Sequence, residues 1–285
     1  MVAHQLNIST GQAALMRALA IVAITLGLIV LTGWALDITA FKSVLPGLIV
    51  QKPNSALGVL LGGACLALLT VRDTRRLVGW GAGLLLVLGL ATLAEYAFDW
   101  NPGFDQWLFH ESINAHFTGN PGRMPVLSAE ILTMLGGAFL LIHLRRNWVA
   151  IQLLALVSCL IALWQMGGYL FGDVQFQDMD GSTSLSLPSG LGFLVLSIGI
   201  LAATVQYGLL AGKQRQLTTI TIAVSLLMLL AAGVAVFHNM SQMRHAVTWV
   251  EHTYQVVTVS TDITSLSYKH QKLLRAFMAG EQERT

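Results

Sequence analysis

The chain has 285 residues, of which 55% are hydrophobic and only 11% are charged, and its mean hydropathy is +0.68. A soluble domain normally has about 25% charged residues. The composition therefore excludes a water-soluble globular protein and indicates a polytopic membrane protein. The formal net charge is +2 and no basic patch is present, so nothing indicates a nucleic-acid partner.

The first apolar stretch near the N-terminus is too long for a cleavable signal peptide and lacks a small-residue cleavage motif. We therefore expect it to remain as the first membrane span. The two cysteines, Cys65 and Cys159, both fall within apolar stretches. We expect them to be small core residues rather than partners in a disulfide or ligands of a zinc ion.

Seven stretches are long and apolar enough to cross a bilayer, which takes about 20 residues of helix. They are residues 14–36, 56–71, 77–98, 127–144, 148–171, 189–210 and 217–237. The second and the fourth are short, so we expect their ends to extend into the preceding loops. The predicted fold is an all-α membrane protein with about seven transmembrane helices and a C-terminal extracytoplasmic amphipathic helix.

Basic residues gather in the short connections on one side of the predicted spans. These residues are Arg72, Arg75, Arg76, Arg145, Arg146, Lys213 and Arg215, with Arg17 on the same side. The longer connections on the other side contain only Lys42, Lys52 and Arg123. The positive-inside rule then predicts a multi-pass protein of the bacterial inner membrane, with a cytoplasmic N-terminus and a periplasmic C-terminus.

A short pattern recurs three times along the chain. The outer ends of the first, third and fifth spans read WALD (34–37), YAFD (96–99) and YLFGD (169–173). Each following span begins with one small residue eight positions before another. These pairs are Asn54 and Gly62, Ser128 and Gly136, and Ser189 and Ser197. Small residues at such spacing allow helices to pack closely in lipid, so the pattern predicts three helical hairpins in the same orientation.

The predicted organisation has three parts. Residues 1–216 form a six-span membrane region of three hairpin repeats, residues 217–239 form a seventh transmembrane helix, and residues 240–285 form an extracytoplasmic helix.

The second outer loop is the longest and the most polar connection. Its candidate ligand-binding or metal-binding residues are Asp99, Asp105, His110, Glu111 and His116. Carboxylates and imidazoles bind divalent metals, and the obvious trial set is His110, Glu111 and His116. Their spacing matches no metal-site template, so a solvated polar loop is the alternative interpretation.

Two glutamates, Glu95 and Glu130, fall near the outer ends of the third and fourth spans. An ionisable group at membrane depth costs a few kcal/mol, so it usually faces the interior of the bundle or a wet cavity. The two could line a ligand pocket or form a proton-linked sensor, or they could simply be hydrated at the interface. No phosphate-binding glycine loop, nucleophile elbow or metalloprotease helix occurs, so we expect no enzyme activity and predict no cofactor.

Near the C-terminus, apolar residues alternate at spacings of three and four, with histidines at two of the positions. This seam consists of Trp249, His252, Val256, Val259, Ile263, Leu266, His270, Leu273 and Phe277. The pattern is typical of a coiled coil and needs a partner helix. The partner is a returning helix of the same chain, a second copy in a homodimer or another membrane subunit. The two histidines set the register of pairing or make it sensitive to pH.

The same C-terminal region resembles a known sensor domain. WVEHTYQV (249–256), followed by RAFMAGE (275–281), resembles the start of the third type of CHASE domain, an extracytoplasmic helical sensor of bacterial receptors. The family's Asp-Ala-Glu-Thr-Gly stretch is replaced by KHQKL from Lys269. The segments GW..D....K...PG (33–47), EY.FD.....D..LF (95–109) and PGRM (121–124) resemble the multi-span sensor region that precedes such domains.

This resemblance implies the membrane-embedded input region of a bacterial sensor histidine kinase or diguanylate cyclase, working as a homodimer in the lipid bilayer. As given, the chain is expected to be either a receptor cut short or a natural remnant of one, and to catalyse nothing. A second interpretation is a structural or accessory subunit of a respiratory or photosynthetic complex. A third is a small transporter that uses Glu95 and Glu130.

Overall fold

The structure is a computed structural model of the chain, and it describes residues 8–43, 49–109, 121–170 and 185–210. All of these residues lie in Met1–Leu230, the first of the two compact units into which the chain divides. The described residues form helices and connections and contain no strand, which confirms the all-α fold class. The helices are α1 (Thr10–Ala35), α2 (Thr39–Ser43), α3 (Pro53–Leu68), α4 (Arg75–Ala97), α5 (Val126–Leu144), α6 (Trp148–Leu170) and α7 (Leu187–Thr204), with short 3-10 turns η1 (Phe104–Gln106) and η3 (Gly208–Leu210).

Five of these helices, α1, α4, α5, α6 and α7, are long and apolar enough to cross a membrane. This agrees with association of the chain with a lipid bilayer. Helix α3 is apolar but has 16 residues, which corresponds to about 24 Å of helix against a hydrocarbon thickness of about 30 Å. It begins at Pro53, three residues before the predicted apolar stretch, as expected for a short span that extends into its loop. The seventh predicted span, 217–237, lies outside the described residues.

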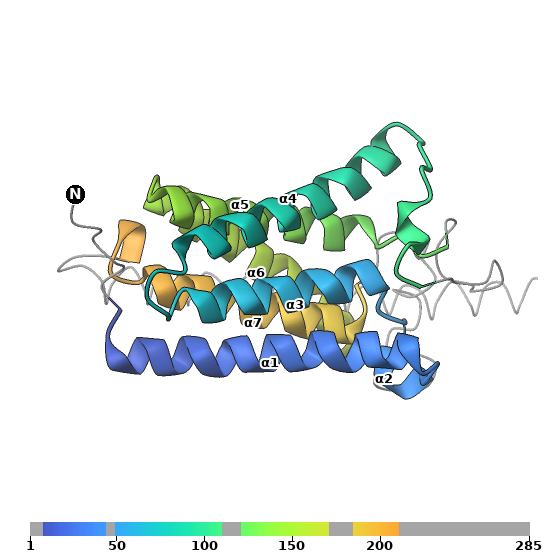
Figure 1. Cartoon of the computed structure of the whole chain (residues 1–285), viewed down its shortest axis with the longest axis horizontal. Helices are drawn as coiled ribbons and strands as arrows, with labels where there is room; N and C mark the ends of the chain where they lie inside the picture. Colours follow the sequence, from blue (N-terminus) through green and yellow to red (C-terminus); the bar gives the residue numbers. More distant parts are fainter. Residues whose placement is uncertain (1–7, 44–48, 110–120, 171–184, 211–285) are drawn as a thin grey trace, which may run out of the picture. The chain divides into compact units, whose positions relative to one another are not determined.

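The described helices pack as neighbouring antiparallel pairs (Figure 1). The most extensive interfaces join α1 to α3, α4 to α5, and α6 to α7. Each pair also contacts the next one, through α3 and α4, α5 and α6, and α7 and α1. Helices α3, α5 and α7 contact one another as well. These three helices therefore form the interior of the described bundle, and α1, α4 and α6 pack around them.

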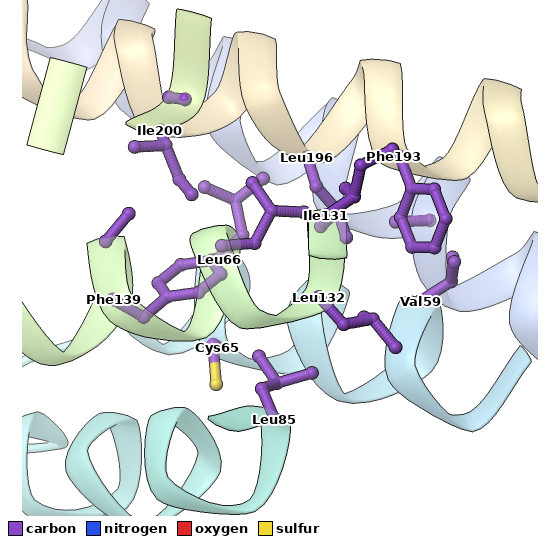
Figure 2. Close-up of a cluster of buried hydrophobic side chains, with 14 of the residues drawn as sticks. Val59, Cys65, Leu66, Leu85, Ile131, Leu132, Phe139, Phe193, Leu196 and Ile200 are labelled. Carbon is purple, nitrogen blue, oxygen red and sulfur yellow. The ribbon is translucent and has the colours of Figure 1, made fainter. Parts of the chain in front are cut away.

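The interior between these helices is filled by large apolar side chains (Figure 2). Leu66 of α3, Leu132 and Phe139 of α5, and Phe193 and Leu196 of α7 are fully buried. Their packing depends on glycines in α3. A Cβ atom on Gly58 would lie 2.6 Å from the side chain of Leu132, and one on Gly62 would lie 2.6 Å from that of Leu196. Small residues thus let the three inner helices approach one another closely.

Two of the three aspartates of the recurring pattern have a structural role at the helix ends, and the third, Asp173, lies outside the described residues. Asp37 follows the end of α1 with φ 54°, and Asp99 follows the end of α4 with φ 48°. The amide after Asp37 donates to the carbonyl of Gly33 at 2.8 Å, and the amide after Asp99 donates to that of Glu95 at 3.1 Å. Both ends are Schellman caps, in which a left-handed residue closes the helix, and aspartate tolerates that conformation.

The arginine-rich turns lie at one end of the bundle, which we call the arginine end. Arg17, near the start of α1, donates from Nε to the hydroxyl of Thr70 in the α3–α4 turn at 3.2 Å. Arg75, at the start of α4, donates from Nε to the carbonyl of His143 near the end of α5 at 2.8 Å. The helix α2, the turn η1 and the loops around them lie at the opposite end (Figure 1). The predicted separation of basic residues is therefore present among the residues that the structure describes, whereas Lys213 and Arg215 lie outside them.

Candidate functional site

A buried group of charged side chains lies at the end opposite the arginine end. It consists of Arg123, Asp105 and Glu95, and we call it the ionic cluster. Nε of Arg123 lies 3.1 Å from Oδ2 of Asp105 and 3.4 Å from Oε2 of Glu95. The three side chains are 2%, 3% and 0% exposed, respectively. Because a buried charge is costly unless it is paired, these contacts decide whether this end of the bundle is stable.

Further contacts tie the ionic cluster to its surroundings. Asn54, in the first turn of α3, donates from Nδ2 to Oδ1 of Asp105 at 3.3 Å. Nη2 of Arg123 donates to the carbonyl of Trp100 at 3.0 Å. The guanidinium also lies over the ring of Tyr96, 5.3 Å from its centroid. The cluster therefore links α3, α4 and the connection that leads into α5.

The backbone around Gly122 explains how Arg123 reaches Asp105. Gly122 has φ 77°, which favours glycine, and a Cβ atom there would lie 2.6 Å from the backbone carbonyl oxygen of Asp105. Glycine at this position therefore allows two distant parts of the connection to touch through their backbones. The next residue, Arg123, is then held beside the Asp105 carboxylate.

The cluster carries more negative than positive charge. Glu95 and Asp105 supply two carboxylates, and Arg123 supplies one guanidinium. Asp105 accepts hydrogen bonds from Arg123 and Asn54, whereas neither oxygen of Glu95 has a hydrogen-bond partner in the described residues. The buried hydroxyl of Thr92, one turn earlier on α4, also lacks a partner there. At Glu95 the site can therefore accept a further positive charge, such as a proton or a small cation.

The predicted site residues lie in different surroundings in the structure. Asp105 and Glu95 meet in the ionic cluster, whereas Asp99 is exposed at the end of α4 and Glu130 is half-buried on α5. The trial metal set, His110, Glu111 and His116, lies outside the described residues, as do all the residues of the C-terminal seam. Within the described residues, no three or more His, Cys, Asp and Glu side chains group in a way that could hold a metal ion.

Sequence reasoning did not identify the two residues that hold Asp105. The sequence shows Arg123 only as one of few basic residues on its side, and its pattern predicts a packing role for Asn54. A usable signal for Arg123 exists: it is a lone cation placed directly before a span, in the same loop as several acids. No comparable signal marks Asn54, because its contact depends on how α3 packs beside the α4–α5 connection.

A second polar assembly stabilises the outer end of α1. The indole Nε1 of Trp34 donates to the carbonyl of Gln51 at 2.8 Å, which ties α1 to the segment before α3. Lys42 of α2 pairs with Asp37 at 2.6 Å and lies over the Trp34 ring, 4.5 Å from its centroid. The side-chain hydrogen bond from Lys42, and then its charge, lower the pKa of Asp37 below its ordinary value. Asp37 is therefore ionised at neutral pH.

No protein-family model matches the chain, and no match is found among curated proteins or solved structures. The fold and the site define an all-helical protein with several apolar helices long enough to span a membrane and a buried ionic cluster at one end of its helices. The likeness to receptor sensor regions remains a prediction.

Proposed function

We propose that this chain is the membrane-embedded input region of a bacterial signal-transduction receptor, and that the ionic cluster passes a stimulus from the outer connection to the helices. One observation carries the proposal. Arg123 belongs to the connection between α4 and α5, yet its charge is paired with Glu95 on α4 and with Asp105, which is held by Asn54 on α3. A change in the connection therefore reaches two helices directly.

The energetics of a buried ion pair suit a switch. Breaking such a pair by removing one partner typically costs about 3–5 kcal/mol, because it leaves an uncompensated charge in a poorly polarisable surrounding. Partial separation of Arg123 from its two carboxylates is therefore unfavourable. A displacement of Arg123 would then be accompanied by a shift of the helices that carry its partners. The carboxylate of Glu95 pairs with Arg123 but accepts no hydrogen bond in the described residues. This suggests the class of stimulus: a positively charged species that balances the second carboxylate.

The helix contacts support the proposed triplicated hairpin. The three main pairs have the same antiparallel form, and each contacts the next through equivalent helices. Gly58 of α3 packs on Leu132 of α5. The two are separated by the same number of residues as Asn54 and Ser128, the small residues with which two of the predicted repeats begin. Gly58 and Leu132 therefore occupy equivalent positions in the two repeats. Asp37 and Asp99 close their helices with the same cap. These observations support a common hairpin design.

The remaining parts of the proposal concern the membrane and the partner. We propose that the arginine end is cytoplasmic, because arginine-rich turns are retained on that side. The ionic cluster and the C-terminal seam would then lie on the periplasmic side of the inner membrane. A homodimer formed through the seam would place two ionic clusters in one receptor. The chain has no catalytic role in this proposal.

Disulfide cross-linking in native membranes tests the proposal. In a coiled coil, Ile263→Cys is at the seam and Thr261→Cys is on the opposite face, so we expect cross-linked dimers for the first and not for the second. Asp105→Asn should then change the yield at Ile263→Cys, because it disturbs the ionic cluster. Asp99→Asn is the matched control, since it removes an exposed carboxylate from the same region.

Each other outcome argues against part of the proposal. Equal cross-linking at both positions, or none, would exclude pairing through the seam. A dimer whose yield is the same in the Asp105→Asn and Asp99→Asn variants would exclude coupling between the cluster and the helix. Co-purification with other membrane proteins in fixed stoichiometry, without the dimer, would favour the accessory-subunit interpretation.

A further inference from the structure

A groove of about 300 Å³ opens at the arginine end of the bundle. It lies between the start of α1, the α3–α4 turn and the end of α5. The groove is independent of the ionic cluster, which lies at the other end of the helices. Its charged lining residues are Arg72, Asp73, Arg75 and Arg145, so three arginines and one aspartate line it.

These arginines are available to a ligand. Arg75 uses Nε to bind the carbonyl of His143, and Nδ1 of His143 bonds back to the carbonyl of Arg75 at 2.9 Å. This reciprocal pair fixes the start of α4 against the end of α5. In the described part of the chain, the Nη groups of Arg75 and the side chains of Arg72 and Arg145 make no hydrogen bond or ion pair. Arginines that line one groove and form no ion pair in the described residues suit phosphate, which a guanidinium group can bind in a bidentate manner.

The N-terminus of α4 opens into the same groove. Its N-cap residue, Thr74, does not cap the helix, because its hydroxyl donates to the carbonyls of Leu68 and Val71 instead. The first amide groups of α4 therefore have no side-chain acceptor. Free amides at a helix N-terminus and the positive end of the helix dipole attract anions. Two features with different origins thus favour a negative ligand at one place.

The groove also has an apolar wall that continues onto the outside of the bundle. Leu68, Leu69, Val78 and Ile142 line it. Beside it, large apolar side chains are exposed, namely Val71 at 56%, Leu77 at 55% and Leu144 at 48%. These residues lie at the ends of α3, α4 and α5, where the hydrocarbon of a bilayer would begin. A ligand with a phosphate and attached acyl chains can contact both the arginines and the apolar side chains, whereas free phosphate can contact only the arginines.

We propose that this arginine groove binds the headgroup of an anionic phospholipid. The phosphate lies between Arg72, Arg145 and the first amides of α4, and the acyl chains follow the exposed apolar side chains along the helices. A lipid bound there bridges the α3–α4 turn and the end of α5.

Native mass spectrometry of the full chain in detergent tests this proposal, with phosphatidylglycerol as the anionic lipid. The Arg72→Gln/Arg145→Gln variant should weaken the first binding step at least about tenfold, since two charge-assisted contacts are lost. The matched control is Arg76→Gln/Arg146→Gln. It removes the same charge from neighbouring residues that do not line the groove, and it should change the affinity less than about twofold. Phosphatidylethanolamine should bind more weakly to the wild type.

Several results would overturn the proposal. Equal losses in the two double variants would show attraction by net charge rather than a site, and no loss in either would exclude the groove. Displacement of the lipid by inorganic phosphate would identify a site for free phosphate instead. The single variant Arg72→Gln, which changes an exposed turn residue, covers the case in which the double variant fails to fold. It should give a smaller loss than the double variant, and wild-type affinity would contradict the proposal.

Discussion

Asp105 accepts a hydrogen bond from Nε of Arg123 at 3.1 Å, and both side chains are almost completely buried. Asp105 lies in the turn η1 and Arg123 lies shortly before α5, so their pairing joins two separate parts of the connection between α4 and α5. Asp105 also accepts from Asn54, which makes α3 a part of the same structure. Several predictions about stability depend on this arrangement.

Replacing Arg123 with glutamine should destabilise the protein strongly. Two buried carboxylates would then have no cation, and such a loss typically costs about 3–5 kcal/mol. Arg146→Gln removes an exposed arginine and should cost less than about 1 kcal/mol. Reversible unfolding in mixed micelles measures both. The additional change Glu95→Gln should restore part of the stability of the Arg123→Gln variant, and a further loss in this double variant would contradict the charge argument.

Gly122→Ala should separate Arg123 from Asp105. Alanine at a positive φ costs about 1–2 kcal/mol, and here its Cβ atom would also meet the backbone of Asp105. The control is Gly103→Ala, which has a similar φ of 80° but no atom within 4 Å of the added Cβ. The Gly122 variant should therefore lose more free energy of unfolding than the Gly103 variant. Equal losses would show that backbone strain alone matters.

Gly89→Ala should disturb the packing of α4 on α5. A Cβ atom at position 89 would lie 2.8 Å from the carbonyl oxygen of Ala129, which belongs to the helix backbone and cannot move aside alone. Overpacking of this kind typically costs about 1–3 kcal/mol. Gly83→Ala on the same helix meets nothing within 4 Å, so it should be neutral or slightly stabilising in the same thermal unfolding measurement. If the two variants had similar stability, the close approach of α4 to α5 at Gly89 would be excluded.

The Lys42–Asp37 pair predicts a particular dependence on pH. The pKa of Asp37 is lowered in the folded protein, so the stabilisation from ionised Asp37 is present above the ordinary aspartate pKa, near about 4. It is lost as the pH falls through the lowered value. The difference in stability between the wild type and Lys42→Gln should therefore be constant near neutrality and shrink in acid. Unfolding measured from about pH 7 to about pH 3 tests this, and a difference that grows in acid would contradict it.

Cysteine labelling tests the proposed orientation of the membrane helices. Asp73→Cys places a thiol in the α3–α4 turn at the arginine end, and Asn101→Cys places one after α4 at the opposite end; both positions are exposed. The native Cys65 and Cys159 are 2% and 6% exposed and should react little. A membrane-impermeant maleimide added from the periplasmic side should label position 101 and leave position 73 until the membrane is opened. Labelling of position 73 and protection of position 101 would show that the helices have the opposite orientation.

The apolar helices could be predicted well from the sequence because hydropathy over about 20 residues is a strong local signal. The short α3 was expected to extend into its loop, and Pro53 marks where it begins, as proline often does at the first helical turn. The position of Asp37 and Asp99 at the ends of their spans was also visible. The reason for aspartate there, a left-handed cap, depends on backbone geometry that the sequence pattern does not specify.

The ionic cluster could be predicted only in part. The sequence leaves Glu95 either facing the bundle interior or hydrated at the interface, and it places Asp105 among polar loop residues such as Asp99. The distinction between these aspartates arises from Gly122, whose backbone contact draws Asp105 inward beside Arg123. That contact joins two residues that lie far apart in the connection between α4 and α5. Local spacing and composition carry no information about such a contact.

The leucine-into-glycine contacts among the inner helices have a consequence for permeation. Leu132 fills the space above Gly58, and Leu196 fills the space above Gly62, so side chains plug the axis along which α3, α5 and α7 meet. A solute could cross there only if these helices moved apart by about the width of a leucine side chain. Such a movement would break the contacts of Leu132 with Gly58 and of Leu196 with Gly62. The close packing of leucine on glycine therefore opposes the opening of a path along this axis.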